Sequence, residues 1–509
     1  MNSGDERKVL RTPPADNAQI RIVAAPGGDV EDVDWSDPSL AVPYADIREE
    51  GEWLMVTGAE RALIVRLAAS CPRLDDAQLT RAIFQGLITS ADKIYHLERL
   101  GPEQYRCAPA GSSPYVIEIE DEIMKPLISG AEAKRYEEPE TDTYLLFPYA
   151  RDARGNMRLV GEDTMRREFP KAWAYLTSWE AALRSRERGA FDDENWWRFG
   201  RNQNLDKQDI EKLIVAQTVP DMRVCADSSA DKYLNNVRVN GILPAPETDL
   251  FYLLGVLNSA LVSFVFRRIA KPKRGEYFEA NRQFIAPLPI PNASPEEQSE
   301  IAAMARALQL GWTRRRELLA AAQERLSVLA RAHHDQRWLW PTLPTIADLE
   351  EAAPGTLTMT CERADWAKRE LEEAVTERIE MLQAALDGGA TLEADFHDGE
   401  LVMHAGGRRL LDRIYLDHDK GRLTERYWRF LLLSQNWRNA SSLAEELRGP
   451  PAEPGGPAAR QFIERVDELA QQVADIAARD RAINESLFTL YNLTEAERFL
   501  VETDRLGRR

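Results

Sequence analysis

The densest group of reactive side chains in the sequence is a short basic run. Five cations and no Asp or Glu lie within eight residues, at Arg267, Arg268, Lys271, Lys273 and Arg274. Lys and Arg at this density neutralise DNA phosphates, and such contacts position a protein on a duplex. A solvated charged loop has the same composition, so both interpretations stay open on this run alone.

Amide and cationic side chains recur near this run and elsewhere. Arg, Asn and Gln are residue types that bind base edges in the major groove. The candidates for DNA contact are Asn281, Arg282 and Gln283, which follow Tyr277 and Phe278; Arg201, Asn202, Gln203, Asn204 and Lys207; and Asn235, Asn236 and Arg238. Asn204, Asn235 and Asn236 fit turns or helix caps equally well, because Asn side chains bind nearby backbone groups.

Two other groups contain residue types found at metal sites. Asp121, followed by Glu132-Ala133-Lys134, fits the loose acidic spacing of metal-dependent nucleases. A chain with 84 Asp and Glu contains such spacings by chance, so we expect surface charge there. His333, His334 and Asp335 end an amphipathic helix, where a polar terminus is expected, and we predict no metal.

Signatures of the common cofactor and nucleophile sites are missing from the sequence. It contains no glycine-rich dinucleotide loop, no phosphate-binding lysine loop, no HExxH and no GxSxG. The four cysteines, Cys71, Cys107, Cys225 and Cys361, form no CxxC pair, which favours a reducing cytoplasm. We therefore expect neither catalytic residues nor a cofactor in this chain.

The charge of the chain is unevenly distributed. The 509 residues are 44% hydrophobic, which indicates two to four packed domains and excludes a disordered acidic chain. The net charge is −19, yet residues 151–291 hold 22 Lys and Arg against 19 Asp and Glu, which leaves −22 on the rest. The total argues against a polyanionic partner, whereas the middle segment does not.

One apolar stretch raises the question of a membrane. Residues 250–266 are seventeen uncharged residues, a length at the short limit for a span, and they include Asn258, Ser259 and Ser263. We expect a helix buried on all sides within a large domain, and no membrane association. The N-terminus opens with charged residues, so no secretory signal is expected.

The elements that must position these residues are mixed. Residues 1–43 hold Pro-Pro, Gly-Gly and an acidic run, which is typical of a linker or flexible tail. Apolar spacing predicts helices over 59–68, from about Asp75, and across 166–188 with the stripe Trp173, Leu176, Trp179 and Leu183. Strands are predicted at 115–119, 144–147, 213–219 and 237–243. The predicted fold class is α+β.

Beyond residue 296 the pattern becomes that of long helices. Apolar residues recur at four-three spacing from Ile301 to His333, as in a coiled coil, and a second stripe runs from Leu371 to Leu386. We expect residues 297–390 to form an antiparallel helical hairpin. Residues 391–509 are expected to be a helical C-terminal region. The spacing leaves open whether the first stripe pairs within one chain or between two.

An ordered set of segments resembles a known family. The segments are GLITSADKIY (86–95), MKPLISGAEAKRY (124–136), LLFPY (145–149), FPKAWAYL and LRSRER within 169–188, WWRFGRNQNLDKQDIEK (196–212), YLLGVLNS (252–259) and FIAPLPIP (284–291). Together they resemble the TaqI-like C-terminal specificity domain of adenine-N6 DNA methyltransferases, fused type II restriction-modification enzymes and related phage-defence methylases. The resemblance covers about residues 44–296, and residues 484–502 resemble the ending of many members.

The catalytic half of that family has no counterpart in this sequence. Family enzymes carry an S-adenosylmethionine-binding domain and an Asn-Pro-Pro-Tyr type motif, and neither occurs here. A target base must enter a pocket before methylation, so a chain without that pocket cannot methylate alone. The resemblance thus implies a split system or a truncated gene. S-adenosylmethionine is then expected on a separate methyltransferase or restriction-system subunit.

The sequence therefore predicts a DNA target-recognition subunit. Residues 44–296 would bind double-stranded DNA, and the helical half would dock the catalytic partner. The alternative is a protein-interaction subunit of a defence complex without base reading, which the charge of −22 outside the middle segment would suit. A metal-dependent nuclease is the third hypothesis.

Overall fold

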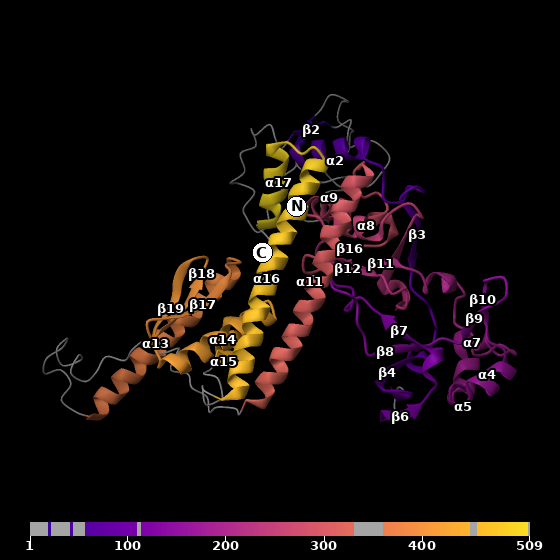
Figure 1. Ribbon diagram of the computed structural model, residues 1–509, viewed down its shortest axis with the longest axis horizontal. Helices are drawn as coiled ribbons and strands as arrows, with labels where there is room; N and C mark the ends of the chain where they lie inside the picture. The colour runs from indigo at the N-terminus through magenta and orange to yellow at the C-terminus, as the bar shows by residue number, and fades with distance from the viewer. Residues whose placement is uncertain are drawn as a thin grey trace, which may run out of the picture. The chain divides into compact units, whose positions relative to one another are not determined.

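The computed structural model describes residues 19–21, 41–43, 56, 58–108, 113–329, 360–447 and 456–506. About 48% of the chain is helical and 20% is strand, with sheets in the middle and a mainly helical C-terminal region, which confirms the α+β class. The chain divides into two compact units, residues 1–310 with 480–505 and residues 311–479 with 506–509 (Figure 1).

Little of the predicted N-terminal tail lies within the described residues. Two short antiparallel strands are described there, β1 (Gln19–Arg21) and β2 (Ala41–Pro43). The remainder of residues 1–43 lies outside the described residues, as do His333, His334 and Asp335.

A six-stranded sheet in the first unit has the order β14-β7-β8-β4-β5-β6. All neighbours are antiparallel except β14 and β7, which run parallel. Its strands are β4 (His96–Gly101), β5 (Gln104–Cys107), β6 (Tyr115–Glu118), β7 (Met124–Ile128), β8 (Thr143–Leu146) and β14 (Tyr233–Leu234). The strands predicted at 115–119 and 144–147 are confirmed as β6 and β8.

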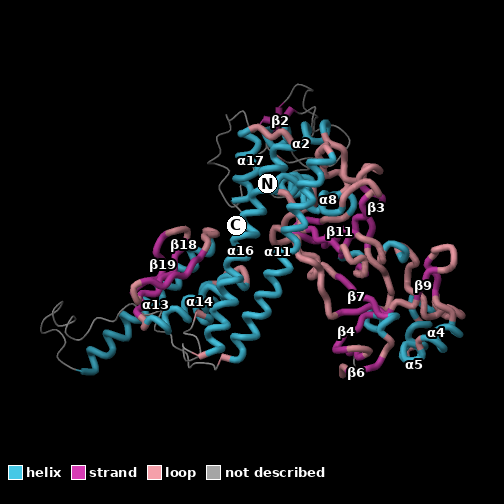
Figure 2. The backbone as a smooth tube through the Cα atoms, viewed as in Figure 1, coloured by secondary structure: helices cyan, strands magenta, loops and turns pink. Residues whose placement is uncertain are grey.

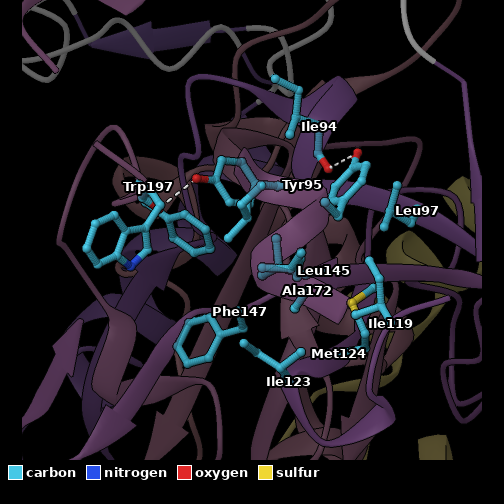
Figure 3. Close-up of a cluster of buried hydrophobic side chains, with 14 of the residues drawn as sticks. Ile94, Tyr95, Leu97, Ile119, Ile123, Met124, Leu145, Phe147, Ala172 and Trp197 are labelled. Carbon is cyan, nitrogen blue, oxygen red and sulfur yellow. Dashed lines mark hydrogen bonds between the residues drawn. The ribbon is translucent and has the colours of Figure 1, made fainter. Parts of the chain in front are cut away.

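A large apolar cluster joins this sheet to three short helices, α4 (Glu162–Glu168), α5 (Pro170–Ser178) and α6 (Glu180–Arg184). A fourth, α7 (Arg186–Gly189), follows them. Figure 3 shows two hydrogen bonds in the cluster: Tyr95 donates to the Trp197 carbonyl at 2.6 Å, and Tyr175 to the Ile94 carbonyl at 2.9 Å. The single helix predicted over 166–188 was wrong, because the backbone leaves helical geometry at Phe169 and Trp179 and turns left-handed at Glu187 and Arg188.

A second sheet, of four antiparallel strands, has the order β13-β11-β15-β3. Its strands are β3 (Thr80–Gln85), β11 (Lys212–Ala216), β13 (Val224–Asp227) and β15 (Val239–Pro244). The strands predicted at 213–219 and 237–243 are confirmed as β11 with β12 (Thr218–Val219) and as β15. The helix predicted from Asp75 was wrong, because residues 80–85 pair with β15 as the edge strand β3.

The apolar stretch forms two buried helices, α8 (Leu250–Leu257) and α9 (Ala260–Ile269), bent by 65°. The Asp249 carboxylate caps α8, and every residue of α8 is buried. Among the described residues, no single helix is long and apolar enough to cross a membrane, and this bent pair passes on length and composition only. The expectation of a core helix is confirmed by the burial of α8.

Two long helices run antiparallel, α11 (Pro295–Val328) and α16 (Pro457–Leu490) (Figure 1). A side chain at Gly311 would lie against Ile476, and Arg314 lies 3.7 Å from Glu468. At residues 311–314, α11 therefore packs against α16 of the same chain. Helix α17 (Glu495–Leu506) follows, and its Glu497 forms an ion pair at 2.9 Å with Arg66 of α2 (Gly58–Ser70).

The second unit combines helices with a strand meander (Figure 2). Its further elements are α13 (Thr360–Asp387), β17 (Leu392–His397), β18 (Glu400–Ala405), β19 (Arg408–Tyr415), α14 (His418–Ser434) and α15 (Ala440–Glu446). Within the helical C-terminal region, residues 392–415 form strands instead, and Asp398-Gly399 and Gly406-Gly407 form their positive-φ hairpin turns.

The described partners of α13 are β19 and the start of α15. Arg378 donates to the Asp412 carbonyl at 2.8 Å, and Gln383 accepts from the Ala440 amide at 2.9 Å. The hairpin of residues 297–390 stays a prediction, since residues 330–359 between its two helices lie outside the described residues.

Candidate nucleic-acid interface

Residues from two of the predicted DNA-contacting groups, 201–207 and 281–283, line one hollow beside the edge strand β3. The hollow has a volume of about 410 Å³. Its lining residues are Arg81, Ala82, Ile83, Phe84 and Gln85 of β3, Gln203, Asn204 and Lys207 of the following loop, Asn240 of β15, and Arg282 of α10 (Arg282–Ile285). We call it the β3 hollow.

Local backbone geometry holds the walls of the β3 hollow in place. Asn204 adopts a left-handed conformation with φ 59°, and its amide donates to the Gln85 carbonyl at 3.0 Å. Lys207 donates to the Asn204 side chain at 2.7 Å. Gly241 is required on β15, because a Cβ there would lie 2.5 Å from the Phe84 ring. Three separate chain segments are thereby fixed around one space.

The lining of the β3 hollow is cationic and rich in amides. Arg81, Lys207 and Arg282 carry positive charge, and none of the ten lining residues is acidic. Within the described part of the chain, the exposed Arg81 and Arg282 guanidinium groups make neither ion pairs nor hydrogen bonds with protein. In a chain of net charge −19, such a lining favours an anionic ligand.

A short hairpin carries three exposed cations of the basic run. Lys273 donates its backbone amide to Tyr277 at 2.6 Å, and Glu279 donates to Lys271 at 2.9 Å. Gly275, with φ 72°, forms the turn. Lys271, Lys273 and Arg274 are exposed, although Lys273 lies 3.8 Å from Glu279. We call residues 271–279 the basic hairpin; its second arm includes β16 (Phe278–Glu279), which pairs with β12.

The two other cations of the basic run are engaged inside the fold. Arg267 pairs with Asp504 of α17, and Arg268 pairs with Glu60 of α2 and with Asp504 at 3.1 Å. Their side chains are only 8% and 13% exposed. Arg267 and Arg268 thus attach α9 to α2 and α17, whereas the cations of the basic hairpin are exposed.

The predicted group at residues 201–207 also includes side chains that already have protein partners. Arg201 forms an ion pair at 2.9 Å with Glu187, whose pKa is lowered by hydrogen bonds from Ser90 and from Arg201. Asn202 is exposed and accepts a long hydrogen bond, 3.5 Å, from Tyr149. Of this cluster, Gln203, Asn204 and Lys207 line the β3 hollow, whereas Arg201 and Asn202 do not.

The third predicted group divides into structural and exposed residues. Asn235 is buried, and its amide donates to Ser129 at 3.3 Å. Asn236, at φ 55°, accepts from the Val237 amide, so it forms the turn that its type allows. Arg238 is exposed and lies near His96, whose pKa is lowered by burial and further by the Arg238 charge.

The residues after the basic hairpin include a helix cap. Asn281 accepts from the Gln283 amide at 3.0 Å and donates to Glu279 at 2.9 Å, so its side chain caps α10. Arg282 faces the β3 hollow. Gln283 is exposed.

Three polar residues of the β3 hollow were missed by sequence reasoning: Arg81, Gln85 and Asn240. The first two lie on β3, where the sequence predicted a helix, so their strand-edge placement was not foreseen. Asn240 stands inside a correctly predicted strand as an isolated polar residue, fully buried. In the sequence, the available signal was an amide residue between Val239 and Gly241 of a predicted strand.

The acidic residues considered for a metal have structural partners. Asp121 accepts hydrogen bonds from Tyr105, from the Glu103 amide and from Arg99. Burial would raise the Asp121 pKa, but these bonds and the Arg99 charge outweigh it and lower the pKa. Glu132 accepts from the Ser129 amide at 2.8 Å. Across the described residues, no three His, Cys, Asp or Glu gather as a metal site.

Comparison with known families assigns this part of the chain. Residues 125–290 match the family model of the TaqI-like C-terminal specificity domain, which confirms the resemblance. The match implies DNA recognition in a methyltransferase-type system. No curated protein matches the chain. The matched segment contains the basic hairpin and half of the residues that line the β3 hollow, while Arg81 to Gln85 precede it.

Proposed function

We propose that this chain, through its TaqI-like specificity domain, binds duplex DNA as the target-recognition component of an adenine-N6 DNA methyltransferase or restriction-modification system. A separate subunit would carry S-adenosylmethionine and the methyl-transfer site. The single observation that carries the proposal is the convergence of basic and amide residues of the matched segment on the β3 hollow and the basic hairpin.

The two features suit different parts of DNA recognition. The exposed cations Lys271, Lys273 and Arg274 suit phosphates, which fix position without reading sequence. The amides and Arg282 around the β3 hollow suit base edges. Arg267 and Arg268 leave the proposed DNA-contacting set because carboxylates already occupy them.

A salt series on random-sequence duplex DNA tests phosphate contact. We expect the triple variant Lys271→Ala, Lys273→Ala, Arg274→Ala to bind more weakly. Its plot of log binding constant against log salt should be shallower by about 0.9 for each lost phosphate contact. The same series with and without the neighbouring gene product tests whether a catalytic partner is needed.

A matched triple variant controls for net charge. Arg408→Ala, Arg422→Ala, Arg460→Ala removes the same three charges from exposed residues of the second unit. We expect its salt slope to equal that of the unchanged chain. Equal slopes for the two triple variants would argue against docking through the basic hairpin. Absence of duplex binding with and without partner would favour the alternative of an interaction subunit.

A further inference from the structure

We propose that the β3 hollow binds one nucleotide, with its phosphate among Arg81, Lys207 and Arg282 and an N–H donor of its base on the Asn240 side chain. This inference deepens the proposed function and, where the nucleotide comes from DNA, rests on it. The nucleotide has two possible sources with the same chemistry, a base extruded from a bound duplex or a free nucleotide.

Asn240 supplies the first half of the argument. Its side chain is fully buried, and its amide nitrogen donates to the Ala280 carbonyl at 2.9 Å. A carbonyl only accepts, so this bond fixes which way the amide points. The amide oxygen, Oδ1, is buried and has no hydrogen-bond partner. Because Asn240 lines the β3 hollow, a ligand there can satisfy this acceptor only with a donor.

The cations supply the second half. A ligand that satisfied Asn240 alone could be neutral, but Arg81 and Arg282 stand at the same hollow with no protein partner in the described part of the chain. Arg binds phosphate oxygens through paired N–H groups. A phosphodiester group has no O–H, so it accepts hydrogen bonds and cannot donate to Asn240. A ligand that meets the cations through such a group therefore needs a separate hydrogen-bond donor for Asn240, which the base of a nucleotide supplies.

The size of the β3 hollow and its remaining polar residues also suit a nucleotide. The volume of about 410 Å³ lies in the range of small-molecule sites. Gln85 and Gln203 each offer a donor and an acceptor, so they can complement the rest of a base edge. Enzymes that act on DNA bases extrude a nucleotide from the stack into a pocket of this kind.

Binding of four small ligands to the full chain, followed by titration calorimetry, tests the chemistry directly. The ligands are dAMP, deoxyadenosine without phosphate, the purine deoxyribonucleotide without the amino group, and inorganic phosphate. We expect dAMP to bind best, with a loss of about tenfold when either the phosphate or the amino group is removed. Inorganic phosphate binding as tightly as dAMP would overturn the proposal.

Variants connect each ligand group to its residue. Arg81→Gln with Arg282→Gln should weaken dAMP at least about tenfold, while deoxyadenosine binding should change little. Asn240→Ser should remove the preference for dAMP over the purine nucleotide. Since Asn240 is buried, folding of the Asn240→Ser variant is first checked by thermal melting. If this variant does not fold, the comparison of dAMP with the purine nucleotide on the unchanged chain still tests the role of the amino group. Arg408→Gln with Arg422→Gln, a charge-matched control, should leave dAMP binding unchanged.

A duplex containing 2-aminopurine separates the two sources. Extrusion should raise its fluorescence on binding, and Arg81→Gln with Arg282→Gln should reduce that rise. A fluorescence rise without free dAMP binding assigns the site to DNA, and dAMP binding without a rise assigns it to a free nucleotide. Hairpin-dependent duplex binding with neither signal would overturn this inference and leave the proposed function standing. Binding of dAMP without any duplex binding would support the nucleotide site and overturn the proposed function.

Discussion

At the scale of single residues, Lys212 shows how the fold accommodates buried charge. Its ammonium and the Asp227 carboxylate are both 0% exposed and lie 2.6 Å apart, and the ammonium also donates to the Gln208 carbonyl at 2.6 Å. Lys212→Met would leave Asp227 charged without its ion-pair partner, so we expect a loss of about 3–5 kcal/mol in the free energy of unfolding. Urea denaturation measures it.

A second variant separates lost pairing from lost packing at this site. In Lys212→Met with Asp227→Leu, both charges are replaced by apolar groups of similar size, and we expect a smaller loss than in the single variant. A double variant as unstable as Lys212→Met would show that packing around the methylene chain, rather than the unpaired carboxylate, causes the loss.

Residue types were predictable from the sequence, but their engagement was not. The sequence alone does not distinguish the five cations of the basic run. Three of them are exposed in the structure, whereas Arg268 meets Glu60 and Asp504, which are 208 and 236 residues away along the chain. Local spacing contains no information about partners so distant. The same holds for Asn240, because the orientation of its amide depends on the hydrogen bond to the Ala280 carbonyl, 40 residues away along the chain.

At the scale of elements, Asp504 attaches α17 to α9 within the first unit. Burial would raise its pKa, but the charges of Arg267 and Arg268 outweigh it and hold the pKa below its usual value. A depressed carboxyl pKa stabilises the fold above the unfolded pKa of about 3.9, and this contribution is lost as the pH falls through the folded pKa. Asp504→Asn should cost about 3 kcal/mol at pH 7 and progressively less below about pH 4.

The measurement is urea unfolding of Asp504→Asn and of the unchanged chain from pH 7 downward. Glu502→Gln, an exposed position on the same helix, is the matched control and should change stability little at any pH. A difference between Asp504→Asn and the unchanged chain that stays constant from pH 7 to below pH 4 would contradict an ion-pair origin.

Elements with a strong local pattern were predicted, and elements defined by pairing were not. The strand at 237–243 and the apolar stretch of 250–266 were recognisable because burial dictates their composition. Strand β3 contains Ala82, Ile83 and Phe84 without alternation, and it is a strand because β15 offers it a partner. The β17–β19 meander was not predicted although Asp398-Gly399 is a hairpin signal, because its short strands lie between long segments with helical spacing.

At the scale of the whole molecule, the proposed division of labour corresponds to the two units. The matched segment lies wholly in the unit formed by residues 1–310 and 480–505. Residues 484–502 also belong to this unit, although the sequence analysis placed them in the helical C-terminal region. The insertion of the second unit between Leu310 and Asp480 was not predictable, because a continuous seam along α11 gives no sign that a unit boundary falls inside the helix.

An excision variant tests whether the first unit is self-sufficient. Helices α11 and α16 run antiparallel, and Arg314 and Glu468 lie side by side, so a short Gly/Ser loop can replace residues 317–466. The shortened chain keeps the β3 hollow, the basic hairpin and the ion pairs of Asp504. We expect cooperative thermal unfolding by circular dichroism and an unchanged salt slope on duplex DNA, with loss of binding to the catalytic partner. If the shortened chain folded but its salt slope changed, part of the phosphate contact would belong to the second unit, and retained partner binding would place the docking surface on the first.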